Sequence, residues 1–193
     1  MKKILLPITL LFLSLTLNSC FYNSMVEKDE AVKSQWAQVE NAYQRRADLI
    51  PNLVNTVKGY ANFEQTTLTA VIEARSKATS VQVDASKLTP ETMKQFEQAQ
   101  AGLSGALSRL MVVAEQYPDL KANQNFLELQ SQLEGTENRI TVERKKFNEA
   151  VNDYNARVRK FPANIEAKIF GFDSKEYFKA TTANADKAPE VKF

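Results

Sequence analysis

A seven-residue spacing of mostly apolar side chains constrains the fold of this chain more than any other feature. A sustained repeat of seven places one stripe along each helix and favours left-handed packing between helices. The first series comprises Trp36, Tyr43, Ile50, Val57, Glu64, Val71 and Ala78. The second series comprises Phe126, Leu133, Ile140, Phe147, Tyr154 and Phe161. Strand-like alternation is missing from the chain, so the sequence predicts an all-α fold.

Local signals indicate where the helices begin and end. Thr89-Pro90-Glu91 combines an N-cap, a proline at the first helical position and an acid in the first turn. Pro118 disfavours helical geometry in the residue before it, Asn123 can cap a following helix, and Pro162 ends that helix. We therefore predict helices over residues 26–80, 90–116 and 123–160, and a shorter segment over residues 164–178 that Gly171 interrupts. These helices form an antiparallel bundle over residues 26–180, followed by a polar tail over residues 181–193.

Pro51 lies inside the first predicted helix. A proline in this position costs about 3 kcal/mol and kinks the helix axis. The seven-residue stripe passes Pro51 without a change of phase, and no turn residues flank it. The sequence therefore predicts one long kinked first helix, roughly 80 Å in length. The predicted helices are unequal, so a simple bundle overhangs at one end.

The N-terminus has the pattern of a secretory signal peptide. Lys2 and Lys3 precede an uncharged run from Ile4 to Leu17, and the small residue Ser19 stands before Cys20. The apolar run is shorter than the roughly 20 residues that a membrane-spanning helix needs. The pattern resembles a bacterial lipobox, in which the chain is cut before the cysteine and the cysteine is lipidated. The alternative is an uncleaved anchor with a free thiol.

This resemblance divides the N-terminal region into a signal peptide over residues 1–19 and a lipid-anchored linker over residues 20–25. It implies an extracytoplasmic protein that acyl chains on Cys20 hold at a membrane. Phe21 follows the cysteine at the position where an aspartate often marks inner-membrane retention. The expected location is therefore the outer membrane, facing the periplasm, if the cell is Gram-negative.

Composition excludes several classes of function. Loss of Lys2 and Lys3 with the signal peptide reduces Lys and Arg from 25 to 23, which equals the 23 Asp and Glu. A balanced chain lacks the basic footprint of a nucleic-acid-binding protein. The sequence has no histidine, so it offers no imidazole base and no histidine ligand for a metal. No nucleotide, calcium or triad motif is present, and we expect no cofactor, no metal and no enzymatic activity.

Several ordered motifs resemble the LemA family. They are Arg45 to Val54 with its continuation to Glu64, Ala74-Arg75, Leu133 to Ile140, Phe147 to Val151, Tyr154-Asn155, Phe161-Pro162, Phe170-Gly171-Phe172 and Pro189 to Phe193. The resemblance implies an antiparallel helical bundle with a long first helix, held at a membrane, and implies no catalysed reaction. The chain departs from many relatives at Phe63. It also has a lipobox-like sequence where many relatives have a transmembrane helix.

Charged residues on or near the stripes have two interpretations. One is a layer of ion pairs that fixes helix register, as polar core positions do in coiled coils. The other is a polar binding site or a proton-handling carboxylate within the bundle. The residues concerned are Arg46, Glu64, Arg75, Glu137, Arg139 and Arg144. Glu137 and Arg144 are expected at seam positions of the helix over residues 123–160.

Two classes of function follow. The first is a non-enzymatic envelope lipoprotein that acts as a helical scaffold for unidentified protein partners, with homo-oligomerisation left open. The second is a carboxylate-dependent hydrolase or lytic enzyme of the envelope. The second requires Glu64 and Glu137 in a water-accessible pocket, roughly 5–10 Å apart. Neutralisation of these carboxylates by arginines would count against it.

Overall fold

The computed structural model describes residues 2–60 and 64–179, with side chains from Phe21 onward. The described chain contains no strand, and the predicted all-α fold is confirmed. The helices are α1 (Lys2–Lys58), α2 (Gln65–Ser80), α3 (Pro90–Ala114), α4 (Pro118–Lys121), α5 (Gln124–Arg159) and α6 (Ala163–Phe170).

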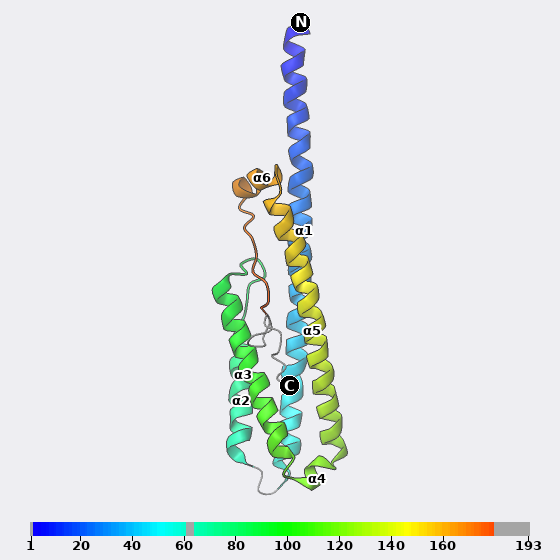
Figure 1. Ribbon diagram of the computed structural model, residues 1–193, viewed down its shortest axis with the longest axis vertical. Helices are drawn as coiled ribbons and strands as arrows, with labels where there is room; N and C mark the ends of the chain where they lie inside the picture. Colours follow the sequence, from blue (N-terminus) through cyan, green and yellow to red (C-terminus); the bar gives the residue numbers. More distant parts are fainter. Residues whose placement is uncertain (1, 61–63, 180–193) are drawn as a thin grey trace, which may run out of the picture.

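Four of these helices form an antiparallel bundle (Figure 1). α1 packs mainly against α5, and α2 packs mainly against α3. α4 is a single turn at one end of the bundle, and α6 lies beside α1 at the other end. α1 continues past the other helices at its N-terminal end (Figure 1).

The prediction of one continuous helix over residues 26–80 is wrong. α1 ends at Lys58, and α2 begins at Gln65 and runs back along the bundle. Gly59 follows α1 directly, where glycine is a weak helix former. The stripe still holds its phase, since Val71 and Ala78 are buried on α2. A stripe records which face of a helix is buried, so it does not reveal that the chain has reversed direction.

α1 passes through Pro51 without a break, as predicted. A proline has no N–H, so it leaves the carbonyl of Ala47, four residues earlier, without its helical partner. Arg75 of α2 supplies the missing donor, because its Nε donates to the Ala47 oxygen at 2.8 Å. The kink at Pro51 stays a prediction.

The other helix boundaries follow their local signals. Thr89 caps α3 and accepts from the Thr92 N–H, and Asn123 caps α5 and accepts from the Phe126 N–H. α6 ends at Phe170 and is followed by Gly171, which has a φ of 74°. This left-handed conformation suits glycine at a helix C-terminus. α6 therefore occupies only the first part of the predicted segment over residues 164–178.

The extended segment after Gly171 fills the space that the longer α1 and α5 leave above α2 and α3. Its Phe178 ring stacks on Trp36 of α1 with centroids 5.8 Å apart, and contacts Phe147 of α5 at 5.3 Å. Phe96 of α3 completes this aromatic cluster. A second apolar cluster fills the other half of the bundle, around Leu53, Leu103, Leu110 and Leu133.

Two asparagines of α5 hold this extended segment by its backbone. The side-chain amide of Asn155 donates to the Lys175 carbonyl at 2.9 Å, and its oxygen accepts from the Lys175 N–H at 2.8 Å. Asn148 makes the same pair of bonds with Phe178, at 3.1 and 2.9 Å. The two asparagines thus provide the backbone partners that a neighbouring strand would provide in a sheet.

Parts of the N- and C-terminal predictions lie outside the described residues. They are the side chain of Cys20, the side chains of residues 1–19 and the tail over residues 181–193. Cleavage and lipid attachment therefore stay predictions. Phe63 also lies outside this part. Among the residues whose side chains are described, no helix has the length and apolarity to cross a bilayer.

Candidate functional site

Arg46 lies at the centre of a polar cluster between the two apolar clusters. Its side chain is 1% exposed and forms an ion pair with Glu137 of α5. One guanidinium nitrogen also donates to the Ser104 hydroxyl at 2.8 Å, and another donates to the Gln100 side-chain oxygen at 2.7 Å. The guanidinium also lies 5.2 Å from the centre of the Tyr43 ring. Arg46 therefore links α1 to both α3 and α5.

Glu137 does not occupy the buried position that the sequence predicted. Its side chain is 47% exposed, so water screens its charge on one side. The buried positions of α5 pass through Thr136, Ile140, Glu143 and Phe147 instead. This three–four spacing puts Glu143, and neither Glu137 nor Arg144, on the seam. The same spacing can be read from the sequence, where Thr136 stands one position before Glu137 and Glu143 stands one position before Arg144.

Buried Glu143 is the carboxylate that the sequence analysis missed. It accepts a hydrogen bond from Gln35 of α1 at 2.7 Å and pairs with Arg139 at 2.7 Å and Lys146 at 3.3 Å. Burial by itself raises the pKa of this carboxyl. The hydrogen bonds from Gln35 and Lys146 and the nearby positive charges outweigh that effect, and the pKa lies below its ordinary value.

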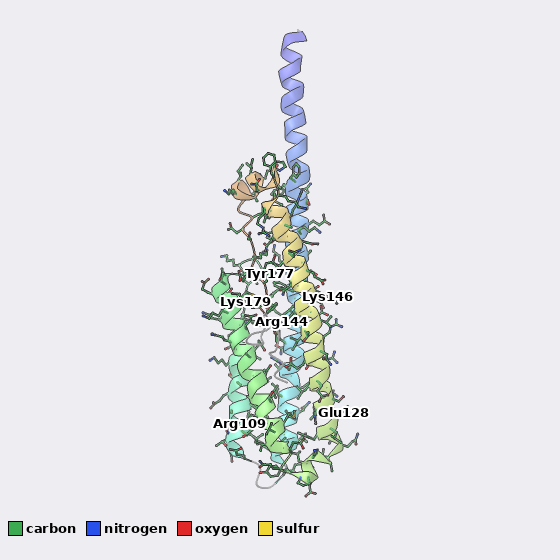
Figure 2. All side chains as sticks on the ribbon, viewed as in Figure 1. Arg109, Glu128, Arg144, Lys146, Tyr177 and Lys179 are labelled. Carbon is green, nitrogen blue, oxygen red and sulfur yellow. The ribbon has the colours of Figure 1, made fainter. Side chains whose placement is uncertain are left out.

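The remaining predicted polar residues lie apart from this cluster. Arg144 pairs with Glu97 of α3 at 3.3 Å and donates to the Lys179 carbonyl at 2.9 Å, near the extended segment (Figure 2). Arg139 is largely exposed. Glu64 is exposed at the start of α2, where it accepts hydrogen bonds from Thr66 and Thr67. The expectation that Glu64 lies in an internal polar layer is wrong, because α1 ends before it.

The carboxylate pair that the hydrolase hypothesis needs is not assembled. The pocket that Glu137 lines does not include Glu64, which is exposed at the start of α2, and Glu137 pairs with Arg46. Among the described residues, no three aspartate, glutamate or cysteine side chains are grouped so that they could hold a metal ion.

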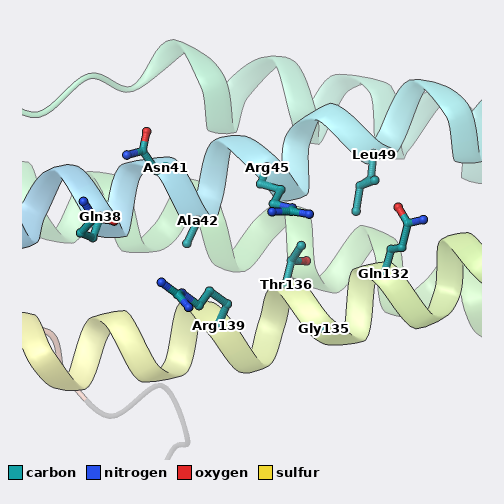
Figure 3. Close-up of a pocket in the computed structure, with 9 residues that line it drawn as sticks. All are labelled: Gln38, Asn41, Ala42, Arg45, Leu49, Gln132, Gly135, Thr136 and Arg139. Atoms are coloured by element: carbon teal, nitrogen blue, oxygen red, sulfur yellow. The ribbon is translucent and has the colours of Figure 1, made fainter.

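A surface groove of about 550 Å³ runs between α1 and α5 (Figure 3). Its α1 wall presents Gln38, Asn41, Ala42, Arg45 and Leu49, and its α5 wall presents Gln132, Gly135, Thr136 and Arg139. Arg139 pairs with Glu143, whereas Arg45 has no carboxylate partner among the described residues. The groove therefore offers one uncompensated positive charge and three side-chain amides to a molecule outside the bundle.

Gly135 lies in the α5 wall of this groove. A glycine inside a helix costs roughly 0.8–1 kcal/mol relative to alanine. A Cβ built at Gly135 would meet no atom within 4 Å, so packing inside the protein does not require glycine here. Its effect is to keep the groove open at that point, which allows a close approach to the α5 backbone.

The fold and the groove define a class of elongated helical-bundle proteins with a polar groove between their two longest helices. The chain belongs to the LemA family, whose sequence model matches residues 35–193. The LemA family expectation from the motifs is therefore confirmed.

The chain is similar to two magnetosome proteins and to one protein named LemA. It is 30% identical to "Magnetosome protein MamQ 2" of Paramagnetospirillum magneticum over 183 residues, which cover 84% of this chain and 66% of that protein. It is 29% identical to "Magnetosome protein MamQ" of Magnetospirillum gryphiswaldense, covering 81% of this chain and 64% of that protein. It is 26% identical to "Protein LemA" of Metamycoplasma hominis, covering 89% of this chain and 78% of that protein. The chain thus spans just under two thirds of the magnetosome proteins' length, and none of these names specifies a catalysed reaction.

Proposed function

We propose that this protein is a membrane-anchored, non-enzymatic envelope lipoprotein whose bundle binds protein partners at the α1–α5 groove. The observation that carries the proposal is the open groove between α1 and α5, where Arg45 has no carboxylate partner among the described residues and Gly135 leaves the α5 backbone accessible. Unpaired Arg45 and the groove amides match a partner segment that carries an acidic side chain and backbone carbonyls. The LemA family membership and the absence of histidine support a role without catalysis.

The anchoring part of the proposal rests on the N-terminal sequence. Cleavage before Cys20 would make Cys20 the first residue of α1, which is helical from that position to Lys58. A rigid helix then connects the anchor to the groove with no flexible linker between them. Such a scaffold holds a bound partner at a fixed height from the membrane.

Gly135→Ala tests the groove. We expect alanine to stabilise α5 by roughly 0.5–1 kcal/mol, while its methyl group lowers the yield of a photo-cross-link from Gln38 to a partner in intact cells. Gly105→Ala is the matched control, because Gly105 is also an exposed mid-helix glycine whose added Cβ meets no atom within 4 Å. The control should raise the melting temperature by a similar amount and leave the cross-link unchanged. Equal cross-linking in the two variants would contradict the groove as the binding surface.

Cys20→Ser tests the anchor. Cys20 is the only cysteine in the sequence, so no other thiol can take the acyl chains. The variant should accumulate as an unprocessed precursor or appear without lipid outside the cytoplasm, and intact mass measures which. If membrane-purified wild type retains Met1 and an unmodified Cys20, the lipoprotein assignment is wrong.

A further inference from the structure

Large exposed apolar side chains gather at one end of the bundle. Nine such side chains are exposed among the described residues, and five of them lie around α6 and the adjoining turn of α1. These five form what we call the apolar collar: Tyr22, Phe161, Ile165, Ile169 and Phe170. Phe161 is 81% exposed and Ile169 is 71% exposed. Clusters of this kind on a water-exposed surface mark an interaction site.

α6 orients its side chains opposite to the usual pattern of a surface helix. Ala163, Ala167 and Glu166 are buried against the bundle, whereas Ile165 and Ile169 point away from it. A helix of a water-soluble surface normally buries its large apolar residues and exposes its charges. The outward face of α6 is therefore suited to an apolar environment.

The collar directly adjoins the N-terminal apolar segment. The Tyr22 ring contacts Phe170 at 5.0 Å and Phe172 at 5.7 Å between centroids. Tyr22 lies two positions after Cys20, and α1 runs without a break from the apolar run over residues 4–17 into this contact. Any membrane that holds residues 4–17 or lipid chains on Cys20 is therefore adjacent to α6.

Charged groups around the collar match a phospholipid surface. Arg159, Lys160 and Lys168 are exposed at the end of α5 and on α6. The Arg157 guanidinium lies 4.9 Å from the Phe21 ring. Interfacial helices combine such cations with outward aromatic and aliphatic side chains, which enter the boundary between headgroups and acyl chains.

We infer that α6 and Phe161 lie in the phospholipid interface and form a second contact with the membrane. This inference rests on the proposed membrane anchoring and adds a surface that the anchor alone does not require. The bundle then has two attachment points, the lipidated start of α1 and the collar, which together fix its orientation relative to the bilayer.

Spin labels test the inference on the full-length protein, purified from membranes and reconstituted in vesicles of phosphatidylethanolamine and phosphatidylglycerol. With Cys20 lipidated, Ile169→Cys and Phe161→Cys each provide one free thiol for a nitroxide. Val112→Cys on α3 is the control, because Val112 is 67% exposed and lies in the last turn of α3, whose C-terminal end adjoins α4 at the opposite end of the bundle from α6. The depth of each label is measured by the ratio of its collisions with oxygen to its collisions with a water-soluble nickel complex. We expect this ratio to be high at both collar sites, as it is for a label in lipid. It should be low at Val112.

The outcomes separate this inference from the proposed function. Collar labels on the water side, in protein that remains with the vesicles, would overturn the collar contact and leave the anchor intact. Labels shielded from both oxygen and nickel would assign the collar to a contact with a second copy of this chain and also overturn the lipid contact. Uptake of label by wild-type Cys20, with protein lost from the vesicles, would overturn the anchor and the collar contact together. Melting curves of the three variants establish that each is folded.

Discussion

Arg46 is a buried charge whose two terminal nitrogens have partners on α3 and α5, while its Nε has no hydrogen-bond partner among the described residues. Its guanidinium is enclosed between α1, α3 and α5, and only Glu137 among its partners carries a compensating charge. Removal of one partner from a buried ion pair is costly because the other charge stays buried. If Glu137 were removed, Arg46 would keep its hydrogen bonds to Ser104 and Gln100. Glu137 is also half exposed, so water already weakens its attraction to Arg46. Both effects reduce the cost of losing this carboxylate.

Glu137→Gln should therefore lower the free energy of unfolding by about 2 kcal/mol, which lies between the values for exposed pairs and for fully buried pairs. Glu134→Gln is the matched control, since Glu134 is exposed one turn away on α5 and accepts a hydrogen bond from Gln130. That change should stay within about 0.5 kcal/mol of wild type. Chemical denaturation measures both. If Glu137→Gln matches the control in stability yet loses activity in cells, Glu137 has a functional role beyond structure.

At the scale of the helices, Pro51 and Arg75 act as one unit. Pro51 removes a hydrogen bond within α1, and Arg75 replaces it with a bond from α2 to the same Ala47 carbonyl. The helix defect thus becomes the point at which α2 docks on α1. Neither residue reveals this pairing in the sequence, although both stood out there.

A double-mutant cycle measures this pairing. Arg75→Met should cost about 1–2 kcal/mol in wild type, because it leaves the Ala47 carbonyl without a donor. In the Pro51→Ala background the cost should be smaller, since the introduced alanine would supply its own N–H to that carbonyl. We expect a coupling energy of about 1 kcal/mol. Additive effects within about 0.3 kcal/mol would show that the two residues act independently.

Helix caps and the continuity of α1 could be predicted from the sequence, whereas the contacts between helices could not. Thr89, Asn123 and the continuity of α1 through Pro51 depend on neighbours in the chain, and the structure agrees with each prediction. The reversal between Lys58 and Gln65 was missed because the stripe has the same phase on both sides. Arg46 was identified as a seam residue, but its contacts with α3 and α5 depend on tertiary packing.

At the scale of the whole molecule, acid should destabilise the bundle through specific carboxylates. The pKa of Glu143 is lowered, and so is that of Asp29, where the bonds from Lys33 and Lys175 outweigh the effect of burial. A carboxyl with a lower pKa in the folded state binds protons more readily after unfolding. Its stabilisation is present above the unfolded pKa and is lost as the pH falls through the folded value.

The melting temperature should therefore stay nearly constant from pH 7 to roughly pH 5 and fall steeply below that. Glu143→Gln should flatten the acid limb, because the titrating group is gone. Glu149→Gln is the control, since its carboxylate is 66% exposed on the same helix. Thermal unfolding followed by circular dichroism across this pH range measures the effect. An unchanged acid limb in Glu143→Gln would assign acid sensitivity to other groups.

The extended segment that contains Phe178 also determines when the bundle can finish folding. Trp36 emerges early in synthesis, yet its stacking partner is among the last described residues of the chain. Contacts between such distant positions form slowly, because a long loop must close before they provide any stabilisation. The α1–α2–α3 half can assemble while the chain is still growing, whereas the aromatic half must wait for α5 and the residues after α6. The part of α1 around Trp36 is thus synthesised early and packed late, and Trp36 fluorescence during refolding should report this final step.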